Sequence, residues 1–307
     1  MKTPVRQKGA VVIVAMLVVA LAASAASVML QQQDVALRQL EAARDYEQAR
    51  WLLDGGAKWA RVILRADARS GRIDHGGELW ATGLPSTGIE EGKLSGEILD
   101  QQGLFNLNNL VRDGNSSARD IAILKRLLET IGLRADLADA IADWIDADSD
   151  LQSPAGAEDT YYLSLAAPYR AANQPMSGIE ELLNVRGCDR AVVARLRQFA
   201  TVLPRRTPVN VNMAPPEVLS AIVEGLTLPE AVVLASGRRS APFRGREDFR
   251  TRLPRTELNV ENVDLSVDTQ FFLVHGLAVV GKANVRMQAL LQRNGVALPS
   301  IVWQRMS

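Results

Sequence analysis

The sequence predicts an α+β fold in which a long N-terminal helix packs on an antiparallel sheet and a large, mostly helical domain is inserted between the strands. Two observations predict it. Residues 10–69 keep a helical pattern without a break, first as a wholly apolar segment and then as an amphipathic one. Residues 112–254 are also helical in pattern, whereas residues 270–305 alternate as strands do. Because extended segments flank the helical region on both sides, that region is predicted to be an insertion into one sheet.

The first element is an apolar segment long enough to cross a membrane. Residues 10–30 carry no ionisable side chain. As a helix at ~1.5 Å per residue this segment is about 31 Å long, which matches the hydrocarbon thickness of a bilayer. Lys2, Arg6 and Lys8 precede it and no acidic residue does, so the positive-inside rule places the N-terminus in the cytoplasm and the bulk of the chain on the other side.

Two interpretations of this N-terminus differ in whether the apolar helix is retained. Residues 23–25 (Ala-Ser-Ala) would serve a secretory signal peptide as a cleavage site, although the apolar segment exceeds the core of about 7 to 15 residues that such peptides have. The junction of Gly9 and Ala10, directly after Lys8, resembles instead the leader of type IV pilins and type II secretion pseudopilins. This resemblance implies that residues 1–9 are a prepilin leader, which prepilin peptidase removes after Gly9.

Cleavage at that junction leaves residues 10–30 attached as a transmembrane helix and makes Ala10 the methylated first residue. Proteins of the pilin type carry a membrane-embedded Glu at the fifth mature position, where this chain has Val14. A carboxylate at that depth costs on the order of 2 to 3 kcal/mol, and in pilins it pairs with the amino group of a neighbouring subunit. Its absence indicates a subunit that does not need that neighbour. Among pseudopilins, the missing Glu and a large size are typical of the minor pseudopilin K of type II secretion.

Composition argues against most other functions. Lys and Arg together number 35, as do Asp and Glu, so no net charge attracts nucleic acid or lipid head groups. Cys188 is the single cysteine, and no intrachain disulfide can form. His75 and His275 are far apart in the sequence, and the chain has no nucleophile elbow, Walker glycine loop or HExxH pattern. We therefore predict that the protein is not an enzyme.

Residues 31–69 predict an amphipathic continuation of the N-terminal helix, the periplasmic half of a pilin spine. Its apolar face, with spacings of three and four, consists of Tyr46, Ala49, Leu53, Ala57, Ala60 and Leu64. The alternative, a coiled-coil stalk, is disfavoured because the pattern lasts little more than four turns. Gly55 and Gly56 lower helix propensity by about 1 kcal/mol each and mark either a bend or a close contact with a strand.

Residues 70–111 and 255–307 are predicted to complete a pilin-like domain around this helix. The glycine-rich residues 70–92 predict a loop. Residues 93–110 predict a strand that runs into a polar turn and contributes to the sheet.

The C-terminal part of that domain is predicted to consist of strands. Residues 270–280 and 283–293 predict two strands joined by a tight turn at Gly281, the second with the half-buried alternation of an antiparallel edge strand. Residues 300–305 predict a final strand. His275 is predicted to be a sheet residue, since no carboxylate or serine motif surrounds it in the sequence.

Residues 112–254 form the predicted helical insert, which contains an acid-rich loop. The acidic residues in and beside the loop are Asp143, Asp146, Asp148, Asp150, Glu158 and Asp159. Alternating aspartates point oxygens into a turning loop, and hard oxygen ligands suit calcium, which takes six to eight of them. The loop is not an EF-hand, because Leu151 stands where that motif needs Gly. From spacing alone, the alternative is a solvated acidic loop.

The same loop resembles a family motif. Residues 143–146 and 156–159 are similar to the block that holds calcium in the helical insert of K pseudopilins. The resemblance implies one or two calcium ions. The ligands that it implies are Asp146, Asp148, Glu158 and Asp159, joined by Asp143 and Asp150.

Two helical hairpins raise a nucleic-acid alternative. Residues 179–199 and 209–234 resemble helix-hairpin-helix units, in which a Gly-apolar-Gly turn offers backbone amides to phosphate. Asp189 and Thr227 replace the second Gly, and Glu230 flanks the later hairpin, where phosphate binding needs Lys or Arg. Just downstream lie Arg238, Arg239, Arg244 and Arg246. Arginines on the surface of a charge-balanced chain are commonly solvated, so we predict packing units and no nucleic-acid partner.

Leader, missing acid, acidic loop and insert occur together and in order, and the chain resembles the K family of type II secretion minor pseudopilins along nearly its whole length. The resemblance implies a single-pass protein of the bacterial inner membrane, mostly periplasmic, that caps the pseudopilus tip and helps start filament assembly for export of folded proteins across the outer membrane. The implied partners are minor pseudopilins I and J, the major pseudopilin and prepilin peptidase, with exported substrate and the secretin as further ones. The alternatives are a membrane-anchored DNA-uptake protein and a calcium-dependent periplasmic binding domain.

Overall fold

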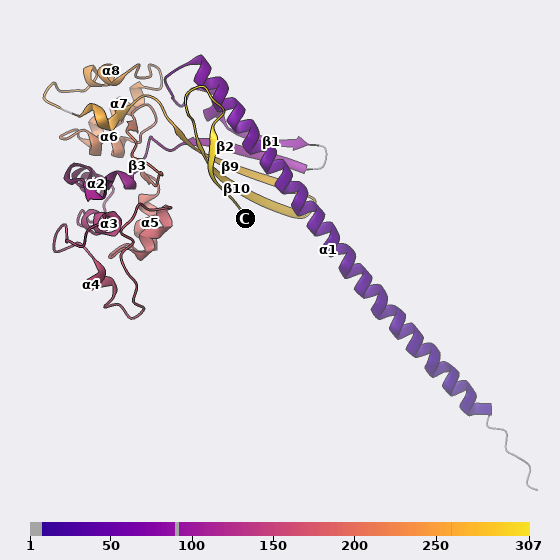
Figure 1. Ribbon diagram of the computed structural model, residues 1–307. Coiled ribbons are helices and arrows are strands. Elements are labelled where there is room, and N and C mark those ends of the chain that lie inside the picture. The colour runs from indigo at the N-terminus through magenta and orange to yellow at the C-terminus, as the bar shows by residue number, and fades with distance from the viewer. Residues whose placement is uncertain (1–7, 90–91, 259) are drawn as a thin grey trace, which may run out of the picture.

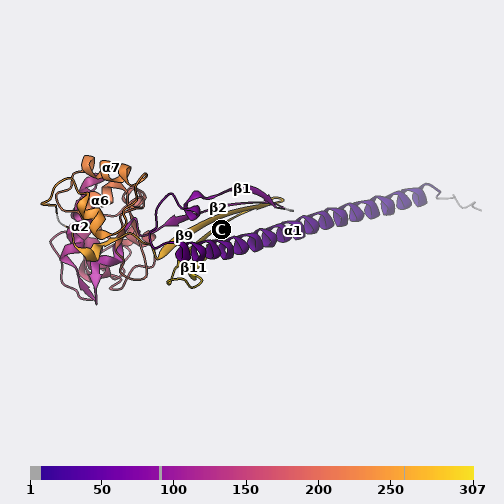
Figure 2. The same ribbon diagram turned by 90° about the horizontal axis from the view of Figure 1, so that it is seen from above.

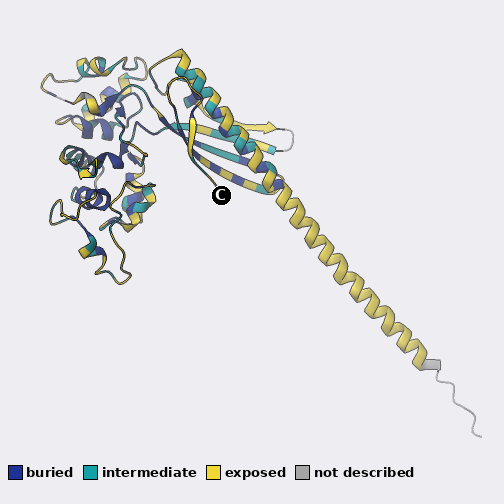
Figure 3. Ribbon diagram, in the orientation of Figure 1, coloured by how far each residue is buried: buried dark blue, intermediate teal, exposed yellow. Residues whose placement is uncertain are grey.

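A single helix, α1 (Lys8–Ser70), forms the spine of the molecule (Figure 1). The computed structural model describes residues 8–89, 92–258 and 260–307; the predicted leader, apart from its last two residues, lies outside this part of the chain. Residues 10–44 of α1 are exposed, and the helix contacts the rest of the protein only from Asp45 onward (Figure 3). Within the described chain, α1 is the one helix long and apolar enough to cross a membrane. The length and apolar composition of α1 support a single-pass membrane anchor.

The second half of α1 packs on one face of a five-stranded antiparallel sheet (Figure 2). The strands are β1 (Leu84–Ile89), β2 (Gly92–Asp100), β9 (Phe271–Val280), β10 (Ala283–Gln292) and β11 (Ser300–Met306), in the order β1-β2-β9-β10-β11. The buried face of α1 consists of Ala49, Leu53, Ala57, Ala60 and Leu64. The predicted apolar face is therefore confirmed, except that Tyr46 is exposed.

Glycines allow the helix to approach the sheet closely. A Cβ at Gly276 of β9 would lie 2.8 Å from Leu53 Cδ2 and 3.3 Å from Met287 Cε. On the helix side, a Cβ at Gly56 would lie 3.7 Å from Leu94 Cδ2 of β2. Of the two alternatives at the Gly55-Gly56 pair, the contact with a strand is the correct one, because α1 continues through it as one helix.

The predicted hairpin at the C-terminal end is confirmed as β9 and β10, with the turn at Gly281 in the left-handed region at φ +51°. In β10 the side chains that face α1 are buried at every second position, as the alternation predicts. The expectation that this strand lies at the sheet edge is wrong, because β11 pairs with it on its other side.

The expectation of a loop over residues 70–92 is also wrong in part. This segment contains the 3₁₀ helix η1 (Leu79–Thr82) and the edge strand β1. Trp80 holds this segment against the sheet, since its buried ring packs edge-on against the ring of Phe272, with 5.1 Å between the ring centroids. Pro85 lies in an edge strand, which tolerates the loss of a backbone donor.

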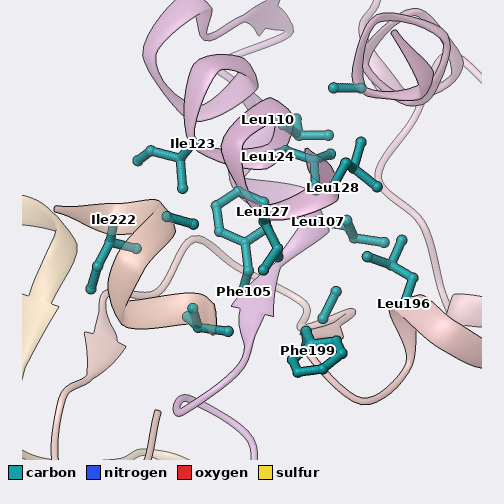
Figure 4. Packing of buried hydrophobic residues seen from close by; sticks show 14 of the residues in the cluster. Phe105, Leu107, Leu110, Ile123, Leu124, Leu127, Leu128, Leu196, Phe199 and Ile222 are labelled. Carbon is teal, nitrogen blue, oxygen red and sulfur yellow. The ribbon is translucent and has the colours of Figure 1, made fainter. Parts of the chain in front are cut away.

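A mostly helical domain fills the sequence between β2 and β9. Its elements are β3 (Phe105–Asn106), η2 (Leu107–Leu110), β4 (Val111–Arg112), β5 (Asn115–Ser116), α2 (Ala118–Thr130), α3 (Leu137–Ile145), α4 (Asp159–Tyr162), η3 (Ile179–Asn184), α5 (Arg190–Leu196), β6 (Ala200–Thr201), β7 (Val209–Asn210), α6 (Pro216–Ile222), α7 (Leu228–Gly237), α8 (Arg246–Thr251), η4 (Asn262–Asp264) and β8 (Leu265–Ser266). It has its own apolar core, separate from the core under α1 (Figure 4). The fold class predicted from the sequence is confirmed.

The structure places more of the chain in this domain than the sequence suggests. Residues 103–110 do not join the large sheet: Phe105 and Leu107 lie in the helical core, and β3 pairs with β6. At the other end, β8 pairs with β7. The physical reason is the sheet register, because Asp100 at the end of β2 lies opposite Phe272 near the start of β9. The whole insert therefore leaves and re-enters between two neighbouring strands.

The close approach at Gly276 generates a testable prediction. Gly276→Val places a branched side chain against Leu53 and Met287, and we expect it to lower the free energy of unfolding of the sheet and spine by about 1–3 kcal/mol. Gly88→Val is the control, since no atom lies within 4 Å of a Cβ there. Hydrogen exchange of the β9 and β10 amides measures the stability of both variants. Equal protection of these amides in the two variants would contradict close packing at Gly276.

Candidate metal centre in the helical domain

Three carboxylates gather beneath the acid-rich loop. Asp143 and Asp146 lie at the C-terminal end of α3, and Glu158 immediately precedes α4. The chain between these helices folds back so that the three side chains share one buried space. Asp143 and Asp146 are 0% exposed and Glu158 is 4% exposed. The structure thus brings together three of the six acids predicted as calcium ligands.

Several oxygens of this trio have no hydrogen-bond partner among the described residues. They are Asp143 Oδ2, Asp146 Oδ1 and both carboxylate oxygens of Glu158. The other two oxygens accept from Gln152, whose backbone N lies 3.1 Å from Asp143 Oδ1 and whose Nε2 lies 3.3 Å from Asp146 Oδ2. Burying an ionised carboxylate without a partner costs several kcal/mol. The trio therefore needs a proton or a cation to complete it.

Burial and mutual repulsion change the acidity of these groups. The pKa of Asp143 is raised to about 6, mainly by burial; backbone hydrogen bonds from Gln152 and Ala157 act against this shift, and the charges of Asp139 and Asp148 add to it. Burial also raises the pKa of Asp146 and of Glu158, each to about 7, with repulsion from the neighbouring aspartates as the second cause. Such values are typical of carboxylates that lack a counter-charge.

A glycine keeps the space above Asp143 open. A Cβ at Gly156 would overlap Asp143 Oδ2, so the backbone of the loop comes closer to this oxygen than any side chain would permit. Orphaned oxygens, hard ligand chemistry and a glycine cradle together fit a divalent cation of the calcium type. Asp143, Asp146 and Glu158 are the residues that would hold it.

The other predicted ligands lie elsewhere. Asp148 is exposed, and its Oδ1 accepts from the backbone N of Asp150 at 2.8 Å, although its charge still raises the pKa of Asp146. Asp150 is exposed. Asp159 is turned toward Ala171, whose N donates to its Oδ1 at 3.0 Å, and toward Arg170 at 3.8 Å.

A further acidic residue next to this trio, Asp139, was not predicted from the sequence. It is buried, pairs with Lys125 at 2.8 Å and accepts from Ser153 Oγ at 2.8 Å. Its spacing of four residues from Asp143 places both carboxylates on one helix face, and that signal could have found it. Because Lys125 already neutralises Asp139, its role is to fix the loop through Ser153.

A second group of acids lies at the junction of spine and sheet. Asp67, Asp74 and Glu78 approach within 4.8 Å of one another. Arg293 supplies the counter-charge, since its guanidinium pairs with Asp67 at 2.8 Å and with Asp74. Glu78 accepts from Trp80 Nε1 at 2.8 Å. With a guanidinium already in place, this group is an ion-pair network.

The hairpin turns do not offer free amides to a phosphate. Gly187 and Gly225 have φ of +79° and +80°, and at the start of each following helix one backbone amide donates to a carboxylate of the chain itself. Asp189 accepts from Val192 N at 2.8 Å, and Thr227 forms a capping box with Glu230. These contacts are consistent with the expectation of packing units.

His275 has one neighbour that the sequence did not reveal. His275 lies in β9, which confirms the prediction of a sheet residue, and its Nδ1 lies 3.2 Å from Glu97 Oε1 on the neighbouring strand β2. The other ring nitrogen lies 3.4 Å from Gln288 Nε2. Neither contact supplies a nucleophile.

The architecture defines a class of protein: a pilin-like filament subunit, with an exposed apolar spine and a helical domain inserted in its head. Comparison with known proteins identifies the family. Residues 103–205 and 209–268 match two family models, both described as type II secretion system (T2SS), protein K. The chain belongs to this family of structural components, and it is a minor pseudopilin.

Relatives cover almost the entire chain. The type II secretion system protein K of Pseudomonas aeruginosa is 33% identical over 94% of this chain and 89% of its own length. That of Klebsiella pneumoniae is 30% identical over 94% of both chains. A chain in the crystal structure of the GspK-GspI-GspJ complex from enterotoxigenic Escherichia coli is similar with a TM-score of 0.77 and 24% identity, over 88% of this chain and 99% of that chain. This similarity supports the same fold.

The raised pKa values generate a prediction about pH. In protein freed of divalent cations by a chelator, the folded state binds more protons than the unfolded state between the ordinary value of 3.8 and about 7, so stability falls as pH rises through this range. Asp146→Asn removes part of that dependence. We expect the wild type to lose on the order of 2 kcal/mol more than this variant between pH 5 and pH 8 in urea unfolding.

The matched control is Asp150→Asn, which removes an exposed carboxylate of the same loop. It should keep the pH dependence of the wild type. A wild-type pH dependence in the Asp146→Asn variant would show that the trio is not its source.

Proposed function

We propose that this minor pseudopilin caps the tip of the type II secretion pseudopilus and helps to start its assembly. The observation that carries this proposal is the place of the helical domain, which lies beside the C-terminal end of α1, at the end of the molecule away from the N-terminus (Figures 1 and 2). In a filament whose spines are parallel, a subunit added above would meet this domain. Assembly then proceeds only below it, for export of folded proteins across the outer membrane.

The residue at position 14 supports the same role. Val14 is 62% exposed on the free half of α1, where pilins carry a Glu. Without a carboxylate, this subunit has no counter-charge to offer to the amino group of a neighbour within the bilayer, where such a pair is worth several kcal/mol. A tip subunit needs neighbours only on its lower side.

The proposed partners are minor pseudopilins I and J. In the related crystal structure, GspK is in complex with GspI and GspJ, and the same arrangement is proposed here. The exposed apolar surface of α1 over residues 10–40 is the natural contact for their spines. The major pseudopilin below, exported substrate and the outer-membrane secretin complete the proposed partners.

Processing and location follow from the same proposal. Prepilin peptidase cuts between Gly9 and Ala10, and methylation of the new N-terminus follows; N-terminal sequencing of the mature protein tests the site of cleavage. The apolar part of α1 then remains in the bacterial inner membrane. Lys2, Arg6 and Lys8 orient the leader to the cytoplasm and the bulk of the chain to the periplasm.

Calcium binding is the second part of the proposal. The orphaned oxygens of Asp143, Asp146 and Glu158 support one ion, and the nearby charge of Asp148 strengthens the attraction. A bound cation would offset the repulsion within the trio and fix the chain between α3 and α4. Its role is structural, because it joins two helices of the insert. Asp150 and Asp159 are proposed as ligands only if a second ion binds.

The calcium proposal predicts a loss of thermal stability on chelation. Calcium at about 100 times its dissociation constant stabilises a folded protein by about 2.7 kcal/mol, so a chelator should lower the melting temperature of the wild type by roughly 5–10 °C. Glu158→Gln should melt at the same temperature with and without chelator. Asp113→Asn, which removes an exposed carboxylate outside the loop, should respond as the wild type does. An unchanged wild-type melting temperature would overturn the proposal.

The cap proposal predicts longer filaments when the insert is removed. Asp100 and Phe272 lie opposite each other, so residues 102–269 can be replaced by a four-residue turn that closes β2 and β9 into a hairpin. In cells that overproduce the major pseudopilin, we expect this shortened chain to permit longer pseudopili than the wild type at equal expression. Electron microscopy measures their length. Equal lengths would contradict a cap formed by the insert.

A further inference from the structure

A cleft lies between the segment that follows α1 and the α6–α7 hairpin. Its volume is about 580 Å³, and its walls come from residues 75–77 on one side and from α6, α7 and the chain before them on the other. It is separate from the acidic trio and from the ion pairs at Arg293, since none of those residues lines it.

The cleft carries positive charge. Arg238 and Arg239 at the end of α7 line it, together with His75, and no carboxylate does. Across the described residues, neither guanidinium forms an ion pair. Arg238 donates to the carbonyl oxygen of Val211 at 2.6 Å, and the exposed Arg239 side chain has no hydrogen-bond partner within the described chain. Both arginines belong to the group of Arg238, Arg239, Arg244 and Arg246, for which the filament role gives no explanation.

The environment of Arg238 shows that the charges interact. Its pKa is lowered to about 10, mainly by burial; the half-buried Asp100 acts in the opposite direction, and the adjacent positive charge of Arg239 acts in the same direction as burial. Asp100 is held by Thr269 and by the backbone N of Gly103, so its oxygens are already engaged. No carboxylate among the residues that line the cleft offsets the charge of the two guanidinium groups.

The remaining walls define the shape of a ligand. The Asn212 side chain donates through Nδ2 to the carbonyl oxygen of Phe243 at 3.0 Å and accepts through Oδ1 from Phe243 N at 2.8 Å. It therefore adds no free polar group to the cleft. Pro216, Val232 and Ala235 give an apolar side, of which Val232 is exposed. His75 accepts from Gly77 N at 3.1 Å through Nδ1, and its Nε2 has no partner among the residues that the structure describes. An anionic group beside an apolar one fits such a cleft.

We propose that this cleft binds a carboxylate side chain, flanked by an apolar residue, of an extended peptide segment from a partner protein. A guanidinium matches a carboxylate in a planar, two-point geometry, and the apolar wall accepts the neighbouring side chain. A nucleic acid fits less well, because phosphate chains need a wider basic surface than two arginines, and Glu217 and Glu230 lie on the same two helices. The proposal does not depend on the cap or on calcium.

The test uses the full chain in detergent micelles and a fluorescein-labelled peptide of sequence Ser-Gly-Val-Glu-Val-Gly-Ser, with a twin in which Gln replaces Glu. Fluorescence anisotropy should show binding of the acidic peptide and at least tenfold weaker binding of its twin. Arg239→Gln should weaken the acidic peptide at least tenfold, whereas Arg239→Lys should weaken it less. Arg244→Gln is the matched control, since this arginine is exposed and does not line the cleft.

A second variant places a negative charge of the protein itself in the cleft. Ala235→Glu places a carboxylate in the cleft itself and should abolish binding of the acidic peptide. Equal effects of Arg239→Gln and Arg244→Gln would overturn the proposal, as would no binding of the acidic peptide at 1 mM. Inorganic phosphate or duplex DNA could displace the acidic peptide while the cleft shows no preference for that peptide over its twin. This result would indicate a phosphate ligand and would also overturn the proposal.

Discussion

The packing of the second half of α1 against one face of the sheet is the contact on which the rest of the structure depends. Each buried leucine of that face contributes about 1.5–3 kcal/mol, and Gly276 lets Leu53 seat against the sheet. The other half of the same helix has no contact with the head, and its residues 10–30 are apolar, as a membrane-spanning segment requires. The same helix is therefore exposed before Asp45 and packs on the head from Asp45 onward.

The place of the insertion explains how a pilin-like head carries so large a domain. Neighbouring antiparallel strands lie only about 5 Å apart, so residues between Asp100 and Phe272 can form a separate core without disturbing the register of the sheet. Buried polar contacts then hold the two parts together. Arg293 joins the end of the spine to Asp74, and Asn210 of the insert donates to the Asp74 carbonyl and to Thr269. The insert is thus held in a fixed position beside the C-terminal end of the spine.

Two sites of opposite charge stand out in a chain without net charge. Beneath the loop, Asp143, Asp146 and Glu158 share a buried space without a cation from the chain. At the other site, Arg238 and Arg239 face a cleft without a carboxylate. Elsewhere, buried charges such as Arg293 find a partner inside the protein. Because unpaired charges are costly when they are buried, the first site is the stronger indication of a ligand, and the second, partly exposed, fits a weaker and reversible one.

The amino-acid sequence alone was enough to predict the fold class, the spine and the hairpin, because each depends on a period along the chain: the free half of α1 on an uninterrupted apolar stretch, and β10 on the alternation that ends in Leu291. It also drew attention to the acidic loop. Which acids meet was settled by the packing of the insert, since spacing gives no account of burial: Asp143 turned inward, whereas Asp150 stayed in solvent. Contacts between distant segments, such as Phe105 in the helical core and the edge strand β1, have no local signal, so they emerged only from the tertiary structure.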